Sequence, residues 1–422
     1  DMLKCYDEEK IGFFESPTGT GKSLSVLCSS ICFLRNKNAQ FIKPKRTFGS
    51  DSESDSGPES SESDFDDFLE DDNKPKPSKL IITTRTHSQI KEMVSELKNL
   101  LGSAKKSRAD ANQQIMIIEG RMKKGEKGLF EELQKHKHIV RSSKEYIDTF
   151  PHCVSLASRK QLCVNPEFKD LPQAELNEKC STKCPFFNDG NLRQFKKQIK
   201  NEPMDIEDLC RYGSSHLLCP YYASRESIPK SDIVLMPYQT LFQSSTRENI
   251  DLSLENAYIV VDEAHNLVDA LNSLFTVTLT DANLEIACKK LLEYRAKIAK
   301  PEKTDKVLAE STTKTRNEDI KNISITFQAL MSIRKACSEE TTKQVLDMND
   351  FQIKYKIRIG NTFSLINWAK DSKIVYKCCH AEKDEALKIE SSEAIRKCLA
   401  FIDMMGNTDE MGSVIIDNKT LS

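Results

Sequence analysis

Residues 15–23, ESPTGTGKS, have the types and spacing needed to bind a phosphate group. They fit the phosphate-binding pattern G-x-x-x-x-G-K-[ST], except that serine replaces the first glycine. In such a loop, backbone N–H groups and the N-terminus of the next helix converge on phosphate oxygens. Lys22 would contact the β- and γ-phosphates, and the Ser23 hydroxyl would coordinate Mg²⁺. The predicted nucleotide-binding residues are Ser16, Pro17, Thr18, Gly19, Thr20, Gly21, Lys22 and Ser23.

A second motif, VVDEAHN at 260–266, supplies the acidic groups that nucleotide hydrolysis needs. The apolar residues before it predict a buried strand, so Asp262 and Glu263 would lie at the carboxyl end of a sheet, where ligands bind. Asp262 suits the coordination shell of Mg²⁺, and Glu263 suits a base that orients or activates the attacking water. His265 could report the state of the γ-phosphate to another part of the protein. DEAH alone is a weak signal, but its pairing with a phosphate-binding loop is a strong one.

Five of the fourteen cysteines fall between residues 163 and 219. Four thiolates brought together bind either zinc or an iron–sulfur cluster. Spacing alone does not choose between these metals, although zinc sites more often show two C-x₂₋₄-C pairs. A disulfide framework is disfavoured, because the chain is large and Lys-rich and has no signal peptide. Cys28 and Cys32, in an apolar helical stretch, are predicted to be small buried side chains.

Strands and helices alternate through the first 270 residues or so. Apolar runs predict strands at 11–15, at the start of 79–97, at 232–238 and at the start of 257–266, with helices between them. This alternation predicts a parallel sheet covered by helices on both faces. From about residue 275 to 400, amphipathic helices dominate, with polar loops around 301–320 and 381–393. GSVIID at 412–417 is predicted to begin a return to the sheet.

Two stretches lack a clear apolar pattern. Residues 49–78 are acidic and Ser-rich, which predicts a disordered insertion, and a solvated spacer is favoured over a phosphorylated segment. Residues 102–148 are Lys-rich and are predicted to be helical or partly disordered. Positions 51–72 hold 11 acidic residues and no Lys or Arg, which leaves 53 acidic against 62 basic residues elsewhere and permits a polyanionic partner. With 30% charged residues and no apolar run long enough to cross a bilayer, a membrane protein is not expected.

GTGKS together with DEAH resembles the DExH-box helicases of superfamily two, in which the first loop position is often not glycine. TRTHSQ, at 84–89, also resembles a motif that follows the second strand in one branch of that superfamily. The resemblance implies that Arg85, Thr86 and His87 contact the nucleic-acid backbone. A capped helix start at Thr86 or Ser88 is the structural alternative, and both interpretations can hold at once.

The cysteine segment narrows this resemblance. RKQLC, KC and CPYY stand in the order of the iron–sulfur insertion of the XPD-like helicases, between the second motor strand and the DEAH strand. By that resemblance Cys153 and Cys210 are structural thiols outside the ligand set. The implied ligands of a 4Fe-4S cluster are Cys163, Cys180, Cys184 and Cys219, which are separated by 16, 3 and 34 residues.

Two basic residues precede the first of these cysteines. Arg159 and Lys160 would contact phosphate, or else form a plain surface turn. The pieces SPTGTGKSLS, CVSLASRKQLCVN and DEAHNL look closest to the Chl-type branch of the XPD-like family, which is associated with chromosome loss and sister-chromatid cohesion.

The resemblance implies an α/β fold with three parts. These are the first of two RecA-like parallel-sheet motor domains, incomplete here, an inserted iron–sulfur cluster domain and a mainly helical Arch domain. The expected division is 1–150 and 226–272 for the motor domain, 151–225 for the cluster domain, 273–408 for the Arch domain and 409–422 for a truncated return toward the motor domain.

The implied activity is that of an ATP-dependent DNA helicase or translocase moving 5′ to 3′, with ATP, Mg²⁺ and a 4Fe-4S cluster. Its implied partners are single-stranded and forked DNA and replication or cohesion proteins, and it would act in the nucleus, in DNA repair and sister-chromatid cohesion. We expect the chain to be a fragment without the second motor domain, which supplies arginine fingers, so its own turnover would be slow. One alternative is a non-motor, DNA-binding iron–sulfur fragment with a degenerate ATP site; a P-loop kinase with a zinc-bound Cys₄ knot is a weaker one.

Overall fold

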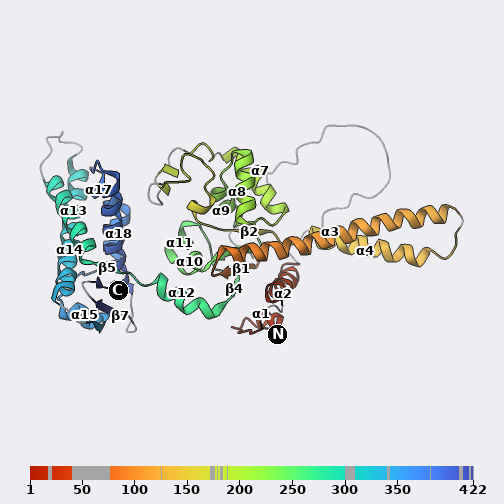
Figure 1. Ribbon diagram of the computed structural model, residues 1–422, viewed down its shortest axis with the longest axis horizontal. Helices are drawn as coiled ribbons and strands as arrows, with labels where there is room; N and C mark the ends of the chain where they lie inside the picture. The colour runs from red at the N-terminus through yellow and green to blue at the C-terminus, as the bar shows by residue number, and fades with distance from the viewer. Residues whose placement is uncertain are drawn as a thin grey trace. The chain divides into compact units, whose positions relative to one another are not determined.

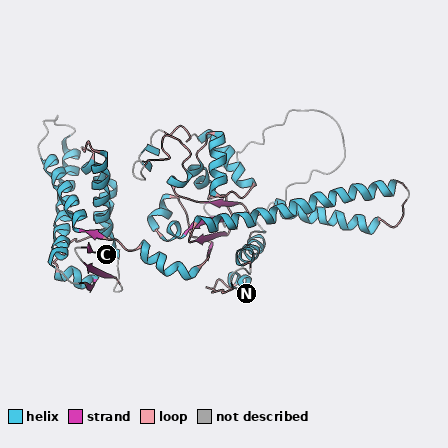
Figure 2. Ribbon diagram, viewed as in Figure 1, coloured by secondary structure: helices cyan, strands magenta, loops and turns pink. Residues whose placement is uncertain are grey.

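The computed structural model describes residues 1–17, 21–39, 77–124, 126–171, 176–177, 179–180, 184–187, 189–299, 309–339, 343–380, 382–407, 412–417 and 420–421. These residues form two compact units, 1–271 and 272–422, which are described separately. Figures 1 and 2 show their helices and strands. The predicted insertion 49–78 lies outside the described residues, apart from its last two positions.

A four-stranded parallel sheet forms the centre of the first unit (Figure 2). Its strands follow the order β2-β3-β1-β4. β1 pairs with both β3 and β4, and β2 pairs with β3, all in parallel. The structure therefore confirms the predicted α/β class. The strands are β1 (Lys79–Thr84), β2 (Cys153–Ser155), β3 (Ile233–Pro237) and β4 (Ala257–Val261).

Helices cover both faces of this sheet, because successive strand residues point to opposite sides. Leu80 and Ile82 share a core with α2 (Lys22–Lys37) and α3 (His87–Lys123). Ile81 points the other way, into a core formed with helices of the cysteine-rich segment. That segment therefore packs directly on the sheet. Its helices are α5 (Arg159–Leu162), α7 (Asp189–Asn201), α8 (Ile206–His216) and α9 (Pro220–Ser227).

The strand predicted at 11–15 is wrong. Residues 11–17 form neither helix nor strand, and Ile11 and Phe13 are 88% and 92% exposed. The preceding helix α1 (Met2–Asp7) packs on α2, where the Tyr6 hydroxyl lies 2.9 Å from the Ser30 hydroxyl. An apolar run becomes a strand only where a neighbour completes its hydrogen-bond ladder. No described residue pairs with 11–15, and β4 forms the edge of the described sheet.

The segment 102–148 is helical apart from the connection between α3 and α4, as far as the structure describes it. α3 and α4 (Phe130–Asp148) form an antiparallel hairpin that projects from the sheet (Figure 1). Seam residues recur every three or four positions, which is the heptad spacing of a coiled coil. Arg108, His136 and Ser143 occupy seam positions, and these polar residues hid the pattern in the sequence. The seam comprises residues 97, 101, 104, 108, 111, 115, 118 and 122 of α3 and 129, 133, 136, 140, 143, 147 and 150 at and around α4.

The remaining elements of the first unit follow β3 and β4. They are α10 (Tyr238–Phe242), α11 (Ser244–Asn249), the 3₁₀ turn η3 (Ala264–Asn266) and α12 (Leu267–Leu274), the last of which continues into the second unit. Within the described residues, none of the helices carries an apolar stretch long enough to cross a membrane.

The second unit is mainly helical, with a small antiparallel sheet of order β5-β8-β7-β6. β7 pairs with β6 and β8, and its Val414 and Ile416 are fully buried in the core of this unit. The predicted return of 412–417 to the parallel sheet is therefore not what the structure shows. The strands are β5 (Leu279–Thr280), β6 (Gln344–Asp347), β7 (Ser413–Asp417) and β8 (Thr420–Leu421).

Two predicted polar loops of this unit are partly helical. Residues 309–320 belong to α14, and 385–393 belong to α18, whose buried face includes Ile395, Cys398 and Ile402. The helices of the unit are α13 (Asp281–Ala299), α14 (Ala309–Glu339), α15 (Met348–Lys354), α16 (Thr362–Asp371), α17 (Ile374–Cys379) and α18 (Glu385–Asn407).

Candidate nucleotide site and cysteine cavity

Both nucleotide motifs lie in the first unit. Gly21 has a φ of +74°, which favours glycine, and immediately precedes α2, so Lys22 and Ser23 are the first residues of that helix. β4 ends just before Asp262, whose N–H donates to the Thr83 carbonyl at 2.9 Å. The charge of Lys22 acts on the Asp262 carboxyl, although 240 positions separate them. Ser16 and Pro17 lie in the irregular segment before the loop, and Thr18, Gly19 and Thr20 lie outside the described residues.

The Asp262 carboxyl is suited to a cation. Burial, and then the neighbouring Glu263 charge, raise the pKa of Asp262, while Lys22 lowers it. A magnesium ion would relieve the cost of holding this carboxylate ionised. Carboxylate and hydroxyl oxygens are the donors that Mg²⁺ prefers, so Asp262 and Ser23 fit the predicted ligand roles.

Four residues around the DEAH turn form a continuous polar chain. Arg85 Nη1 donates to Asn266 Oδ1 at 2.9 Å, and Asn266 Nδ2 lies 2.8 Å from His265 Nε2. His265 Nδ1 lies 3.2 Å from Glu263 Oε2. Glu263 itself has a φ of +52°, a left-handed conformation that is rare for residues other than glycine and is often found at functional sites. The predicted DNA-contact motif is thus joined to the predicted catalytic carboxylate.

The direction of each hydrogen bond in this chain follows from Arg85. A guanidinium only donates, so the Asn266 atom that faces Arg85 is the carbonyl oxygen. The Asn266 amide nitrogen then faces His265 and donates to Nε2, which leaves the ring proton on Nδ1. Nδ1 lies 3.2 Å from Glu263 Oε2, within ion-pair distance. Asn266 therefore fixes which ring nitrogen of His265 faces Glu263.

Tyr238, like Asn266, contacts the DEAH turn and was not predicted as a site residue from the sequence. Its hydroxyl donates to the backbone carbonyl of Asp262. Burial raises the pKa of Tyr238 to about 12, with further contributions from the Asp262 and Glu263 charges. Tyr238 directly follows β3, at the carboxyl edge of the sheet where Asp262 lies. The sequence did offer one indication of this role, because Tyr238 ends the predicted strand 232–238 and so lies at the edge of the sheet where ligands bind.

The TRTHSQ motif forms a capped helix start. The Thr86 N–H donates to Gln89 Oε1 at 3.0 Å, and the Gln89 N–H donates to Thr86 Oγ1 at 3.5 Å, which together make a capping box. This confirms Thr86 as the N-cap of α3. His87 is half-buried beside Gln161, and burial lowers its pKa. Arg85 is exposed, and contacts of this motif with nucleic acid stay a prediction.

The four predicted ligand cysteines line one cavity in the first unit. Asn165 Nδ2 donates to Cys184 Sγ at 3.6 Å. Cys219 caps the N-terminus of α9, where the backbone N–H groups of Tyr221 and Tyr222 face its sulfur. Burial nevertheless raises the pKa of Cys219 to about 12. These N–H donors and the four cysteines in one cavity lining fit an iron–sulfur or zinc centre, either of which would hold the thiols deprotonated.

The structure itself does not show a metal centre. Within the described ranges, no group of three or more His, Cys, Asp or Glu side chains is arranged to hold a metal ion. Cys153 is buried in β2, and Cys210 Sγ donates to the Gln161 carbonyl at 3.4 Å, and neither cysteine lines the cavity. Cys28 and Cys32, which were predicted to be buried, are exposed on α2, because the buried face of that helix is formed by Leu27, Ile31 and Leu34.

Arg159 and Lys160 have partners within the cysteine-rich segment. Arg159 lines the cavity, with its guanidinium 4.8 Å from the Tyr221 ring centre and its buried Nε without a hydrogen-bond partner. Lys160 Nζ donates to the carbonyls of Lys169 and Leu171, both at 2.8 Å. Lys160 therefore stabilises the 165–171 turn, and its predicted contact with phosphate stays untested.

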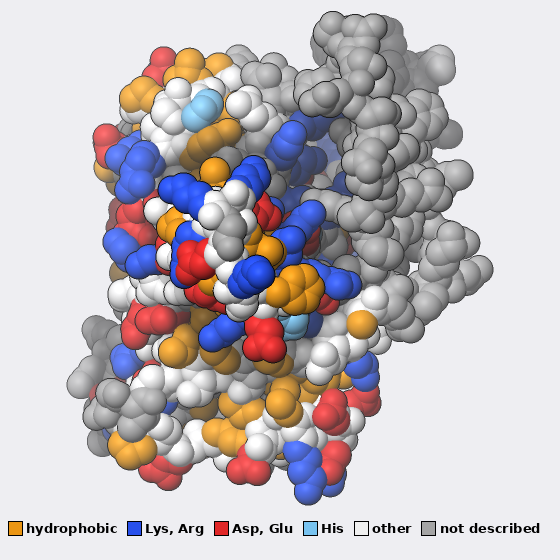
Figure 3. Space-filling model, turned by 90° about the vertical axis from the view of Figure 1, so that its right-hand side faces the viewer, with side chains coloured by type: hydrophobic (Ala, Val, Ile, Leu, Met, Phe, Trp, Pro, Cys, Tyr) orange, Lys and Arg blue, Asp and Glu red, His pale blue; other side chains and the backbone are white. Residues whose placement is uncertain are grey.

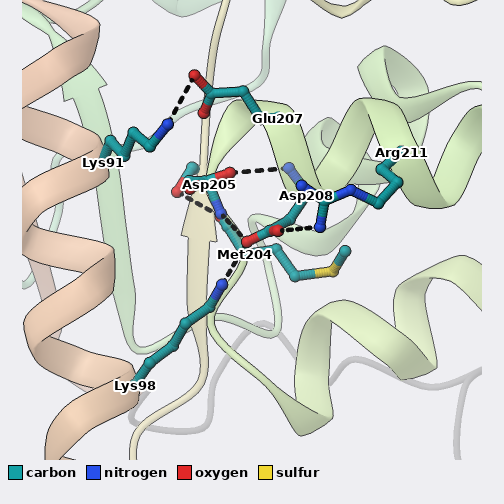
Figure 4. A network of polar contacts seen from close by, with 8 residues as sticks. Lys91, Lys98, Met204, Asp205, Glu207, Asp208 and Arg211 are labelled. Atoms are coloured by element: carbon teal, nitrogen blue, oxygen red, sulfur yellow. Dashed lines mark hydrogen bonds and ion pairs between the residues drawn. The ribbon is translucent and has the colours of Figure 1, made fainter.

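Charged residues fasten the cysteine-rich segment to α3 (Figure 4). Lys91 Nζ lies 3.2 Å from Glu207 Oε1, and Lys98 pairs with Asp208. Asp208 also accepts from Arg211 Nη1 at 3.0 Å, and its N–H donates to Asp205 Oδ1 at 2.8 Å, which caps α8. Arg85, just before α3, thus contacts the DEAH turn, and the N-terminal half of α3 contacts the segment that holds the cysteines.

Comparison with known proteins shows which proteins this chain is similar to. Residues 82–284 match the DEAD_2 family model. A protein of Candida glabrata named "ATP-dependent DNA helicase CHL1" is 25% identical over 99% of this chain and 61% of its own length. One from Schizosaccharomyces pombe with the same name is 34% identical over 54% of this chain and 23% of its own length. The chain is therefore similar to DNA helicases named CHL1, and its residues 82–284 are similar to the DEAD_2 family.

Solved structures give a weaker likeness. Two chains titled "XPD_Helicase" and "Truncated XPD" align with 99% of this chain at 15% and 14% identity, each with a TM-score of 0.43. The alignments cover 51% and 83% of those chains. The chain spans 61%, 42% and 58% of the lengths of three yeast CHL1 relatives, less than two thirds of each.

Proposed function

We propose that the protein carrying this chain is an ATP-dependent DNA helicase or translocase that moves 5′ to 3′. The observation that carries the proposal is the position of Asp262, which follows β4 at the carboxyl edge of the parallel sheet and whose pKa, raised by burial, is partly lowered by the charge of Lys22, the first residue of α2. Parallel sheets bind ligands at this edge. The names of the relatives and the matched family support the same activity.

In this proposal the protein residues divide the work of ATP hydrolysis. Lys22 and the N-terminus of α2 hold the phosphates. Asp262 and Ser23 hold Mg²⁺, which when bound neutralises charge on the phosphate oxygens. Glu263, oriented by His265, accepts a proton from the attacking water. Asn266 fixes the histidine tautomer, and Arg85 fixes Asn266.

The test is DNA-stimulated ATP hydrolysis by the full-length protein, with Lys22→Ala as the comparison. Loss of the Lys22 charge should lower kcat/KM at least about 100-fold, since charge stabilisation of this kind is worth several kcal/mol. DNA affinity should stay within about threefold of the wild-type value. Unchanged hydrolysis in the Lys22→Ala protein would contradict the assignment of the nucleotide site. DNA binding by the wild type without DNA-stimulated hydrolysis would favour the non-motor alternative.

We further propose that the cavity lined by Cys163, Cys180, Cys184 and Cys219 holds a 4Fe-4S cluster. The support is the presence of all four cysteines in the lining of one cavity and the N–H groups directed at two of the sulfurs. Protein purified without oxygen should be yellow-brown and contain about four iron atoms per chain. Stoichiometric zinc without iron would contradict the cluster and leave the helicase proposal untouched.

The resemblance to the Chl-type branch supports three finer proposals. The substrate is single-stranded or forked DNA, gripped through phosphates and stacked bases and therefore sensitive to salt. The protein acts in the nucleus, in chromosome maintenance and sister-chromatid cohesion, beside replication or cohesion proteins. Imaging of the tagged protein, and scoring of cohesion when Lys22→Ala replaces the wild type, test these roles; cytoplasmic residence or normal cohesion would contradict them.

A further inference from the structure

The distal part of the α3–α4 hairpin has no role in the nucleotide site or the cysteine cavity. Its small core of Ile115, Ile118, Leu129 and Leu133 is separate from the core that joins the base of the hairpin to the sheet. Figure 1 shows the two helices running out from the sheet side by side. Ordering a projecting pair of helices costs conformational entropy, so such an arm usually has a binding partner for its surface.

One flank of this arm is basic. The heptad register puts Lys105 on α3 and Lys137 and Lys144 on α4 at the positions that border the seam on the same side. The ion pair between Lys137 Nζ and Glu119 Oε1, at 4.0 Å, confirms that these border positions of the two helices face each other. We define the basic flank as these three lysines with Lys123 and Arg141, which occupy the next positions outward. Figure 3 views the arm from its tip and shows Lys and Arg side chains gathered around it, among hydrophobic and acidic ones.

The side chains of the basic flank are available to a ligand. All five are exposed, and Lys105, Lys123, Arg141 and Lys144 make no hydrogen bond or ion pair with any residue that the structure describes. Lysines at the base of α3 behave differently, since Lys91 and Lys98 pair with Glu207 and Asp208. The two acidic side chains in the same positions are Glu119, paired with Lys137, and Asp148 at the base of the arm.

We propose that the basic flank of the α3–α4 hairpin binds the phosphate backbone of double-stranded nucleic acid. From Lys105 to Lys123 the helix rises roughly 27 Å at about 1.5 Å per residue, which matches about eight base pairs at 3.4 Å each. A straight, stiff pair of helices suits a stiff duplex. Single strands are usually held by aromatic stacking, and Phe130 is the single aromatic residue in these border positions. Contacts of this kind fix orientation and carry no sequence preference.

The proposal adds a duplex contact to the proposed helicase, and it does not depend on the nucleotide site. α3 begins at the TRTHSQ motif, so the helix that would touch the tracked strand also carries the basic flank outward. The arm would then hold duplex ahead of or behind the motor domain. The alternative ligand of the arm is an acidic protein, which would contact the exposed Met116 and Phe130 near the tip as well as the lysines.

Duplex binding by the full-length protein without nucleotide is the test, followed as the anisotropy of a labelled 20-base-pair DNA. The variant is Lys105→Glu with Lys144→Glu. The matched control, Lys124→Glu with Lys135→Glu, makes the same change of charge on the opposite flank of the same two helices. The flank variant should lose about 10- to 100-fold in duplex affinity at 50 mM salt, with a salt slope smaller by about two, at roughly 0.9 per phosphate contact.

The control variant should lose less than about threefold, and affinity for a single strand should stay within twofold in both variants. Equal losses in the two variants, or no loss in the flank variant, would overturn the proposal. Loss of binding to an acidic protein with duplex affinity intact would also overturn it. Circular dichroism checks folding, and Lys105→Gln with Lys144→Gln, which keeps good helix formers, gives the same answer if the glutamates disturb the arm. Failure of single-strand binding in the wild type would instead count against the helicase.

Discussion

Replacement of Asn266 by alanine tests the polar chain that joins Arg85 to Glu263. The alanine removes the two hydrogen bonds of this chain, one of 2.9 Å from Arg85 and one of 2.8 Å to His265, together with a longer one of 3.4 Å to the Glu263 carbonyl. Both Arg85 and His265 are exposed and can turn to water, so each bond contributes about 1 kcal/mol net to holding the geometry. A loss of about 2 kcal/mol corresponds to roughly a 30-fold change in rate. DNA-stimulated kcat should therefore fall by about 10- to 30-fold.

Steady-state ATP hydrolysis by the full-length protein, measured across DNA concentrations, separates this effect from weaker DNA binding. The Asn266→Ala protein should reach half-maximal stimulation at a DNA concentration within threefold of wild type, because Arg85 remains. Asn266→Asp keeps an acceptor for Arg85 but has no amide to donate to a neutral His265, so its kcat should also fall. An Asn266→Ala protein with wild-type kcat, or one whose whole defect is restored by saturating DNA, would refute the reasoning.

Three other substitutions give sharp expectations. Cys163→Ser should abolish visible absorbance and bound iron. Cys153→Ser, which changes a buried thiol outside the cavity, should keep both. Equal iron in the two proteins would contradict the assignment of Cys163 as a ligand. Gly213→Ala would bring a methyl group within 2.6 Å of Pro220 and 2.7 Å of the Leu218 carbonyl, so this change should lower the free energy of unfolding by about 1–3 kcal/mol in urea. Gly120→Ala places its methyl group in open space within a helix and should raise the free energy of unfolding by about 0.5–1 kcal/mol. His136→Leu removes a buried ring nitrogen without a partner from the hairpin seam and should raise the stability of the helices by about 1 kcal/mol in a thermal melt; a lower melting temperature would show that the nitrogen has a partner in solution.

The strands and helices around the predicted nucleotide site were predictable from local sequence. The apolar runs before Asp262 and after Lys79 identified neighbouring strands, and the helix after Gly21 followed from its apolar spacing. Thr86 was recognisable as an N-cap from its type and from Gln89 three residues later. Each of these elements depends on local sequence, which is why the elements were predicted correctly, while nucleotide binding itself stays a prediction.

Other features depend on tertiary partners that local sequence does not report. The run 11–15 has the composition of a strand, but no described neighbour completes its ladder. β7 has the same kind of composition, and its pairing with β6 rather than with the parallel sheet was not encoded in its own residues. The hairpin seam was obscured by Arg108 and His136, whose long side chains are tolerated in a partly exposed seam.

The roles of Asn266 and Tyr238 were missed for a different reason. Asn266 follows the DEAH motif directly, but its function depends on Arg85, which is 181 positions away. Tyr238 contacts a backbone carbonyl, and every residue type carries one, so the sequence gives no sign of this contact. The joining of α3 to the cysteine-rich segment through Lys91 and Lys98 has the same long-range character.

Strand displacement by the full-length protein tests the central claim most directly. The substrates are two labelled duplexes that differ only in carrying a 5′ or a 3′ single-stranded tail, and the comparison protein is Glu263→Gln, which keeps the shape of the side chain but removes the proposed base. The account predicts displacement with ATP and Mg²⁺ on the 5′-tailed duplex, little on the 3′-tailed one, and none by Glu263→Gln. Equal displacement by the wild type and Glu263→Gln, or none by either, would contradict it.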